Sequence, residues 1–125
     1  MQDYRRLKVW QRAHANTLAV RDVANRFPRS GYASLKFQLL SSAESIPTNI
    51  VEGTAASSQK DFARFLDISI KSAGETEYQL LLARDYGVLN PVSFDSLTAE
   101  VIEIRKMLCG LRKKVIADGR SESEP

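Results

Sequence analysis

Cysteine is nearly absent from this sequence, since Cys109 is the only one among 125 residues. A single thiol cannot form a disulfide within the chain, which suits a reducing compartment. Long apolar runs are absent as well. No segment approaches the ~20 apolar residues that cross a bilayer, and residues 1–22 contain no apolar core of a signal peptide. We therefore expect a cytoplasmic protein that makes no contact with a membrane.

Motifs for catalysis or metal binding are also scarce. A zinc site needs three or four Cys, His or carboxylate ligands, whereas this chain has one Cys and one His, far apart in sequence. The sequence has no glycine-rich phosphate loop, no G-x-S-x-G nucleophile motif and no Glu-x-x-His motif of the kind that binds two iron ions. We therefore expect no enzymatic activity, no cofactor and no metal ion.

Two reactive side chains still need an explanation. His14 falls on the apolar stripe of the first predicted helix, which favours a packed, hydrogen-bonded imidazole. Cys109 flanks the apolar seam of the last predicted helix, which favours a buried structural thiol. Helical RNA-cleaving domains of the HEPN type place an arginine a few residues before a histidine, whereas Arg12 precedes His14 by only two. An enzyme that uses His14 or Glu52 is the least favoured alternative.

The pattern that is present is helical, because no segment shows sustained period-2 alternation. Apolar residues at three- and four-residue steps predict helices over residues 5–26, 32–52, 58–86 and 93–119. The stripe of the first helix comprises Leu7, Trp10, His14, Thr17 and Leu18, with Ala13, Val20 and Ala24 beside it. The seam of the last helix comprises Leu97, Val101, Ile104, Leu108, Leu111 and Val115, which follow heptad spacing.

Glycine residues mark the expected ends of the last three helices. Gly53, Gly87 and Gly119 each suit the position that terminates a helix, and Ser58 with Asp61 approximates a capping box at the start of the third. Short loops between long helices make neighbouring helices antiparallel. The sequence therefore predicts an all-α, up-down-up-down four-helix bundle over residues 1–117, followed by a polar, disordered tail over residues 118–125.

Pro47 interrupts the second predicted helix. Proline removes one backbone donor, which frees the carbonyl of Ala43, so we expect the helix to continue on both sides with a bend. Around it, Ser45, Asn49 and Glu52 share one helical face. These polar groups are expected to satisfy the freed carbonyl and to bond the next helix. The alternative is a binding site built on Asn49 and Glu52.

The same segment resembles a family signature. Residues 45–53, Ser-Ile-Pro-Thr-Asn-Ile-Val-Glu-Gly, are similar to the S-I-P-x-N-I-x-E-G motif of a bacterial four-helix-bundle family encoded in intervening sequences of large-subunit ribosomal RNA genes. The signature positions are Ser45, Pro47, Asn49, Glu52 and Gly53. Further matches, in the expected order, are residues 7–11, residues 61–66, Ser72 with Glu75 and Glu77, and residues 107–111.

This resemblance implies a cytoplasmic bundle that assembles as a homopentamer and has no known enzymatic activity. The family is related to the accessory variability protein of diversity-generating retroelements. For those relatives, the resemblance implies binding to nucleic acid and to a reverse transcriptase. Ala73 and Thr76 are smaller or more polar than the leucines usual at these family positions.

The charge distribution points to one end of the predicted bundle. Residues 1–117 hold 17 basic and 12 acidic side chains. An up-down-up-down topology collects the following cations at one end: Arg5, Arg6, Lys8, Arg12, Lys60, Arg64, Arg112, Lys113 and Lys114. Arg5, Lys8 and Arg12 would form one stripe, at steps of three and four. Cations in the first turn of a helix oppose its dipole, so helix stability does not explain them, whereas phosphate binding does. An ordinary solvated face is the alternative.

Two functions are compatible with these observations. The first is a non-catalytic homo-oligomer whose basic end binds RNA or DNA, with contacts to the backbone because only Tyr4 and Trp10 supply aromatic rings there. In this function the protein could serve as an accessory to a protein partner. The second is a structural or protein-interaction oligomer without nucleic acid. Five apolar residues outside the main stripes suit an oligomer interface: Val9, Phe37, Leu40, Ile102 and Ile116.

Overall fold

A computed structural model describes residues 2–123 of the chain. A 3₁₀ turn, η1 (Tyr4–Arg6), precedes four helices: α1 (Lys8–Ala24), α2 (Ala33–Thr54), α3 (Gln59–Asp85) and α4 (Pro91–Ser123). The described residues contain no β-strand, so the prediction of an all-α chain with four helices is confirmed. None of these helices is both long enough and apolar enough to span a bilayer.

Local sequence explains where the helices begin and end. The Ser58 hydroxyl accepts a hydrogen bond from the backbone N–H of Asp61 (3.1 Å), as expected of an N-cap. Asn90 caps the start of α4 in the same way, with its side-chain oxygen 2.8 Å from the N–H of Ser93. Gly87 follows α3 with φ +80, a conformation that glycine adopts without strain. The predicted end of α3 is therefore correct.

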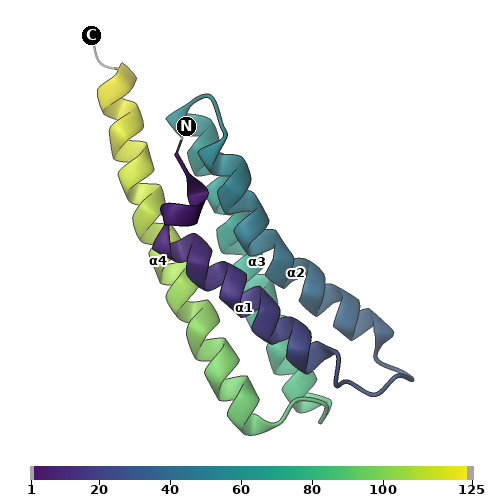
Figure 1. Cartoon of the computed structure of the whole chain (residues 1–125). Coiled ribbons are helices and arrows are strands. Elements are labelled where there is room, and N and C mark those ends of the chain that lie inside the picture. The colour runs from purple at the N-terminus through teal and green to yellow at the C-terminus, as the bar shows by residue number, and fades with distance from the viewer. Residues whose placement is uncertain (1, 124–125) are drawn as a thin grey trace.

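Small hydroxyl side chains join α2 to α3. Their hydrogen bonds run from Ser69 to the carbonyl oxygen of Ile46 (2.8 Å), from Ser72 to Ser45 (2.7 Å) and from Thr76 to Ser42 (3.0 Å). Along this seam the residue numbers of the partners in α2 fall as those in α3 rise. Figure 1 shows the segment before α1, the α2–α3 connection and the C-terminal half of α4 at the same end of the molecule.

The buried face of α4 follows the predicted seam, but that of α1 does not. In α4, Leu97, Val101, Ile104, Leu108 and Val115 are buried, with Leu111 packed against them. In α1 the buried residues are Val9, Ala13, Asn16, Val20 and Ala24. His14 is exposed and stacks on Trp10 with ring centroids 5.0 Å apart, and Leu18 is 51% exposed. The small alanine face allows α1 to approach its neighbours closely, and it leaves the polar imidazole in solvent.

The prediction of a packed, hydrogen-bonded His14 is therefore wrong. Cys109 is a free thiol of intermediate exposure, not the fully buried one expected. It lies beside the α4 seam, next to buried Leu108. The described residues contain no group of three or more His, Cys, Asp or Glu side chains that could hold a metal ion.

Helix α2 passes through Pro47 without interruption. The carbonyl of Ala43, which loses its usual donor at Pro47, lies 3.2 Å from the hydroxyl oxygen of Thr17 in α1. Gly53 was predicted to terminate this helix, but it lies inside α2, which continues to Thr54. A Cβ atom there would be 2.7 Å from Cδ1 of Phe62, so glycine at this position allows α3 to pack closely against α2.

The predicted end of α4 at Gly119 is also wrong, because the helix continues to Ser123. A Cβ atom at Gly119 would lie 3.1 Å from Cβ of Gln59, so this glycine allows close contact between α4 and the start of α3. One glycine inside a helix costs only about 1 kcal/mol. Residues 118–123, expected to belong to a disordered tail, are helical, and residues 124–125 lie outside the described part of the chain.

Candidate nucleic-acid interface

The predicted stripe of Arg5, Lys8 and Arg12 does not form. Arg5 lies in η1, and Leu7 that follows is extended (φ −76, ψ 121), so α1 begins only at Lys8. Asp3 caps the short turn by accepting from the N–H of Arg5 (3.1 Å). The break in the helix rotates Arg5 away from the register of the other two residues. The guanidinium carbon of Arg5 instead lies 5.2 Å from the ring centroid of Tyr4.

Arg12 is turned toward α4, away from the predicted basic end. Its Nε atom donates to Oε2 of Glu100 (3.0 Å), and a terminal nitrogen lies 3.5 Å from the sulfur of Met107. The hydrogen-bonded carboxylate of Glu100 raises the pKa of Arg12 above its ordinary value. Glu100 precedes Arg112 by twelve residues, or about 18 Å along a helix. Arg12 therefore lies beside the first half and the middle of α4, away from its C-terminal end.

The other predicted cations gather where α3 begins and α4 ends. A groove of about 730 Å³ lies between these segments. Four cationic side chains line it, from Lys60, Arg64, Arg112 and Arg120, together with the carboxylates of Asp61 and Asp67. Lys113 and Lys114 follow Arg112 on α4 and are exposed. Five of the eight predicted site residues are thus at the same end, and Arg120 was missed because it was assigned to the tail.

These cations fall into two classes, arginines that form an ion pair and lysines that form none with a described residue. Arg64 pairs with Asp61 at 3.5 Å and lies over the ring of Phe65, and Arg112 pairs with Asp67. The lysines at positions 60, 113 and 114 are exposed and form no ion pair with another described residue. Lysine ammonium groups bind phosphate as point charges, and arginine can bind it with two parallel hydrogen bonds. The cations at this end are therefore of the two kinds that bind phosphate groups in proteins.

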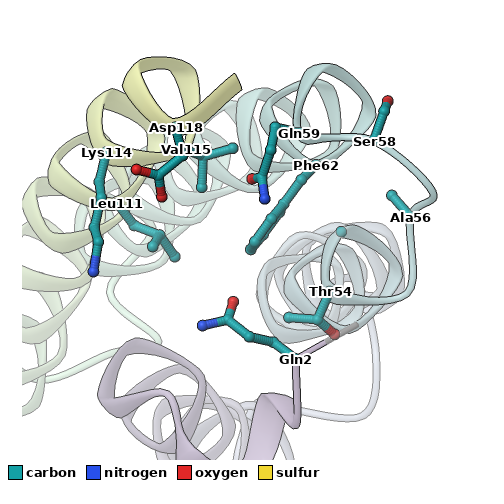
Figure 2. A pocket seen from close by; sticks show the side chains of 11 residues that line it. Gln2, Thr54, Ala56, Ser58, Gln59, Phe62, Leu111, Lys114, Val115 and Asp118 are labelled. Atoms are coloured by element: carbon teal, nitrogen blue, oxygen red, sulfur yellow. The ribbon is translucent and has the colours of Figure 1, made fainter. Parts of the chain in front are cut away.

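A second cavity, of about 320 Å³, opens at the same end of the molecule. It lies between the N-terminal segment, the α2–α3 connection and the C-terminal half of α4 (Figure 2). Figure 2 shows the side chains of Gln2, Gln59 and Phe62 directed toward this space, with Lys114 and Asp118 across it. Sequence reasoning missed this cavity because Gln2 and Gln59 belong to segments that only the tertiary fold brings together.

The signature residues of α2 lie away from both cavities, apart from Gly53. Ser45 accepts hydrogen bonds from the Asn49 amide (3.0 Å) and from the Ser72 hydroxyl (2.7 Å). Asn49 also donates to the carbonyl oxygen of Ser45 (2.8 Å). Pro47 is buried and Glu52 is exposed. The serine and the asparagine are therefore engaged in bonds within α2 and to α3, while the Glu52 carboxylate is open to solvent.

Comparison with known proteins places these features in context. Residues 5–110 match the family described as 23S rRNA-intervening sequence protein. The chain is also similar to a crystal structure of a protein of unknown function from the S23 ribosomal protein family of Bacteroides thetaiotaomicron, with a TM-score of 0.79 and 27% identity. That similarity covers 84% of this chain and 98% of the other. No curated protein matches the sequence. The family match ends before Arg112, so it carries no argument for the groove cations on α4.

Proposed function

We infer that this chain, which belongs to the 23S rRNA-intervening sequence protein family, is a non-catalytic helical bundle that binds the phosphate backbone of RNA or DNA. The observation that carries this proposal is the gathering of cations at the start of α3 and in the C-terminal half of α4. There Lys60, Arg64 and Arg112 line the groove, and Lys113 and Lys114 are exposed on α4 next to Arg112. The proposed surface therefore comprises Lys60, Arg64, Arg112, Lys113 and Lys114. It omits Arg5, Lys8 and Arg12, because Arg5 lies outside the helix that begins at Lys8 and Arg12 pairs with Glu100.

The existing ion pairs do not block phosphate binding. Exposed pairs of this kind contribute only about 0–1 kcal/mol each, so a phosphate can replace Asp61 beside Arg64 or Asp67 beside Arg112. Binding of a cation to a phosphate releases condensed counterions, which makes affinity fall with salt. Because these contacts read charge and spacing, the expected binding depends steeply on salt and weakly on sequence.

The test compares two triple variants of equal charge. The groove variant carries Lys60→Gln, Lys113→Gln and Lys114→Gln, and the control carries Arg21→Gln, Arg26→Gln and Arg29→Gln at the opposite end. Each phosphate contact contributes about −0.7 to the slope of log K against log salt for a single strand. We therefore expect the groove variant to bind more weakly, with a slope flatter by about 2, and the control to behave like the parent. Equal losses in both variants would show only general attraction to a basic protein.

The proposed architecture is an antiparallel up-down-up-down bundle that bends at Pro47. Among the hydrogen-bonded pairs of α2 and α3, residue numbers fall in α2 as they rise in α3, which supports the antiparallel arrangement of these two helices. A similar order, with Asp67 bonded to Arg112 and Glu77 to Arg105, supports it for α3 and α4. The contact between the Thr17 hydroxyl and the carbonyl of Ala43 supports the bend at Pro47. That hydroxyl, which also bonds the nearer carbonyl of Ala13, partly satisfies the group that Pro47 leaves without a donor.

We also propose that the bundle is a homo-oligomer. Two large apolar side chains are exposed on α1 and α2, with Leu18 51% and Phe37 66% exposed. Of the residues expected at an interface, Val9 lies in the core and Leu40 and Ile116 pack against it, so they give no support. The pentamer number and the reverse transcriptase partner rest on the resemblance alone.

Light scattering at micromolar concentration tests the oligomer, and Phe37→Ser should shift a parent assembly toward monomers. A monomeric parent would contradict the homo-oligomer. An assembly that binds no nucleic acid at low salt would favour the second function, a protein-interaction oligomer, whose supporting observation is the same exposed apolar surface.

A further inference from the structure

The cavity at the end of the bundle has two kinds of lining that suit a flat ligand with hydrogen-bonding edges. Phe62, Leu111 and Val115 supply apolar side chains. Gln2 and Gln59 supply amides, which extend into the space from different segments (Figure 2). Each amide has both donors and an acceptor. The lining therefore combines an aromatic ring with groups that can pair with either polarity of hydrogen bond.

The two amides are the groups left available for a ligand. Neither side-chain amide forms a hydrogen bond with another described residue. The nearby hydroxyls are already engaged, since Thr54 donates to the carbonyl oxygen of Val51 (2.8 Å) and Ser58 caps α3. A ligand that enters would therefore meet the amides first, and these have no internal bond to give up.

We propose that this cavity binds an unpaired nucleobase of a strand whose phosphates lie at the basic groove. This inference rests on the proposed function. The volume of about 320 Å³ is at the lower end of the range of small-ligand pockets, so it can hold one base. Base edges present the donors and acceptors that glutamine amides match. Proteins that read single strands commonly hold splayed bases against aromatic and hydrogen-bonding side chains.

The position of the cavity next to the groove supports the same inference. Ser58, Gln59 and Val115 line both spaces, so a strand that crosses the start of α3 can reach them together. Lys114 lines the cavity itself and can contact the phosphate of the inserted nucleotide. The proposal therefore adds a preference for single strands with bases to the backbone binding described above.

The first test uses the parent protein and two oligonucleotides of equal length and charge. One is a single-stranded RNA, and the other is the same sugar–phosphate strand without bases. We expect the abasic strand to bind about tenfold more weakly, because it lacks the base that would pair with the two amides. Equal affinities for the two strands would overturn the cavity proposal and leave the groove proposal intact.

The second test changes the cavity. The variant Gln2→Leu with Gln59→Leu removes both amides, and Gln38→Leu with Gln79→Leu is the matched control, with one exposed and one half-buried glutamine. We expect the first variant to lose about tenfold for single-stranded RNA and nothing for the abasic strand, with helicity unchanged by circular dichroism. An unchanged affinity for RNA would contradict the proposal. Failure of the parent to bind either strand at low salt would instead refute the proposed function, and this inference with it.

Discussion

Asn16 offers a prediction whose sign follows from the structure. Its side chain is buried in α1, with only 3% exposed, and neither amide atom has a hydrogen-bond partner among the described residues. A buried polar group left without a partner costs about 1–3 kcal/mol. Replacing Asn16 by leucine removes this cost and adds apolar contact in the core. We therefore expect Asn16→Leu to raise the free energy of unfolding by about 1–3 kcal/mol.

Asn49 provides the matched control, because its amide donates to the hydroxyl and the carbonyl oxygens of Ser45. Asn49→Leu should lower the free energy of unfolding by about 1 kcal/mol or more, since a typical hydrogen bond contributes about 0.5–1.5 kcal/mol. Urea unfolding followed by circular dichroism measures both changes, at one protomer concentration because assembly shifts apparent stability. A loss of stability in Asn16→Leu as large as that in Asn49→Leu would refute the reasoning.

Three further substitutions test the packing of the helices. Gly53→Ala should destabilise the fold by about 1–3 kcal/mol, because its Cβ would meet Phe62 at 2.7 Å; thermal unfolding measures this. Gly74→Ala, in the same assay, should stabilise by about 0.5–1 kcal/mol, since a Cβ there meets nothing within 4 Å. Thr17→Val should destabilise by about 0.5–1.5 kcal/mol because it removes the hydroxyl proton that the carbonyls of Ala13 and Ala43 share, and an unchanged urea midpoint would contradict that role.

The helices were predictable where the apolar period was strong. Leu97, Val101 and Ile104 follow heptad steps with branched or long side chains, and these residues are buried as expected. In α1 two neighbouring faces competed, one with Trp10 and Leu18 and one with small alanines. The face with Trp10 and Leu18 has the larger apolar side chains, so the sequence pattern predicted that this face would be buried. Tertiary packing selected the second, because small residues allow a close approach between helices.

Glycine roles could not be read from sequence alone. Gly87 and Gly53 both precede a break in the apolar pattern, yet the first has a positive φ and the second lies inside a helix against Phe62. The two roles differ in backbone conformation and in what packs nearby, and neither is visible in a single sequence.

The candidate site was predictable only in part. The concentration of cations near Lys60 and Arg112 followed from the order of the helices. The ion pair of Arg12 with Glu100 joins residues 88 positions apart, and no local spacing indicates it. The cavity at the end of the bundle also depends on long-range placement, because Gln2 and Gln59 come from separate segments.

The salt dependence of binding tests the central claim most directly. If all five cations of the proposed surface contact phosphates, log K for a single-stranded RNA should fall against log salt with a slope of about −3.5 per protomer. The groove variant, with two of these cations left, should give a slope of about −1.4. A parent slope near zero, or no binding by the parent at about 50 mM salt, would contradict the proposal that this family member binds nucleic acid through the groove between α3 and α4.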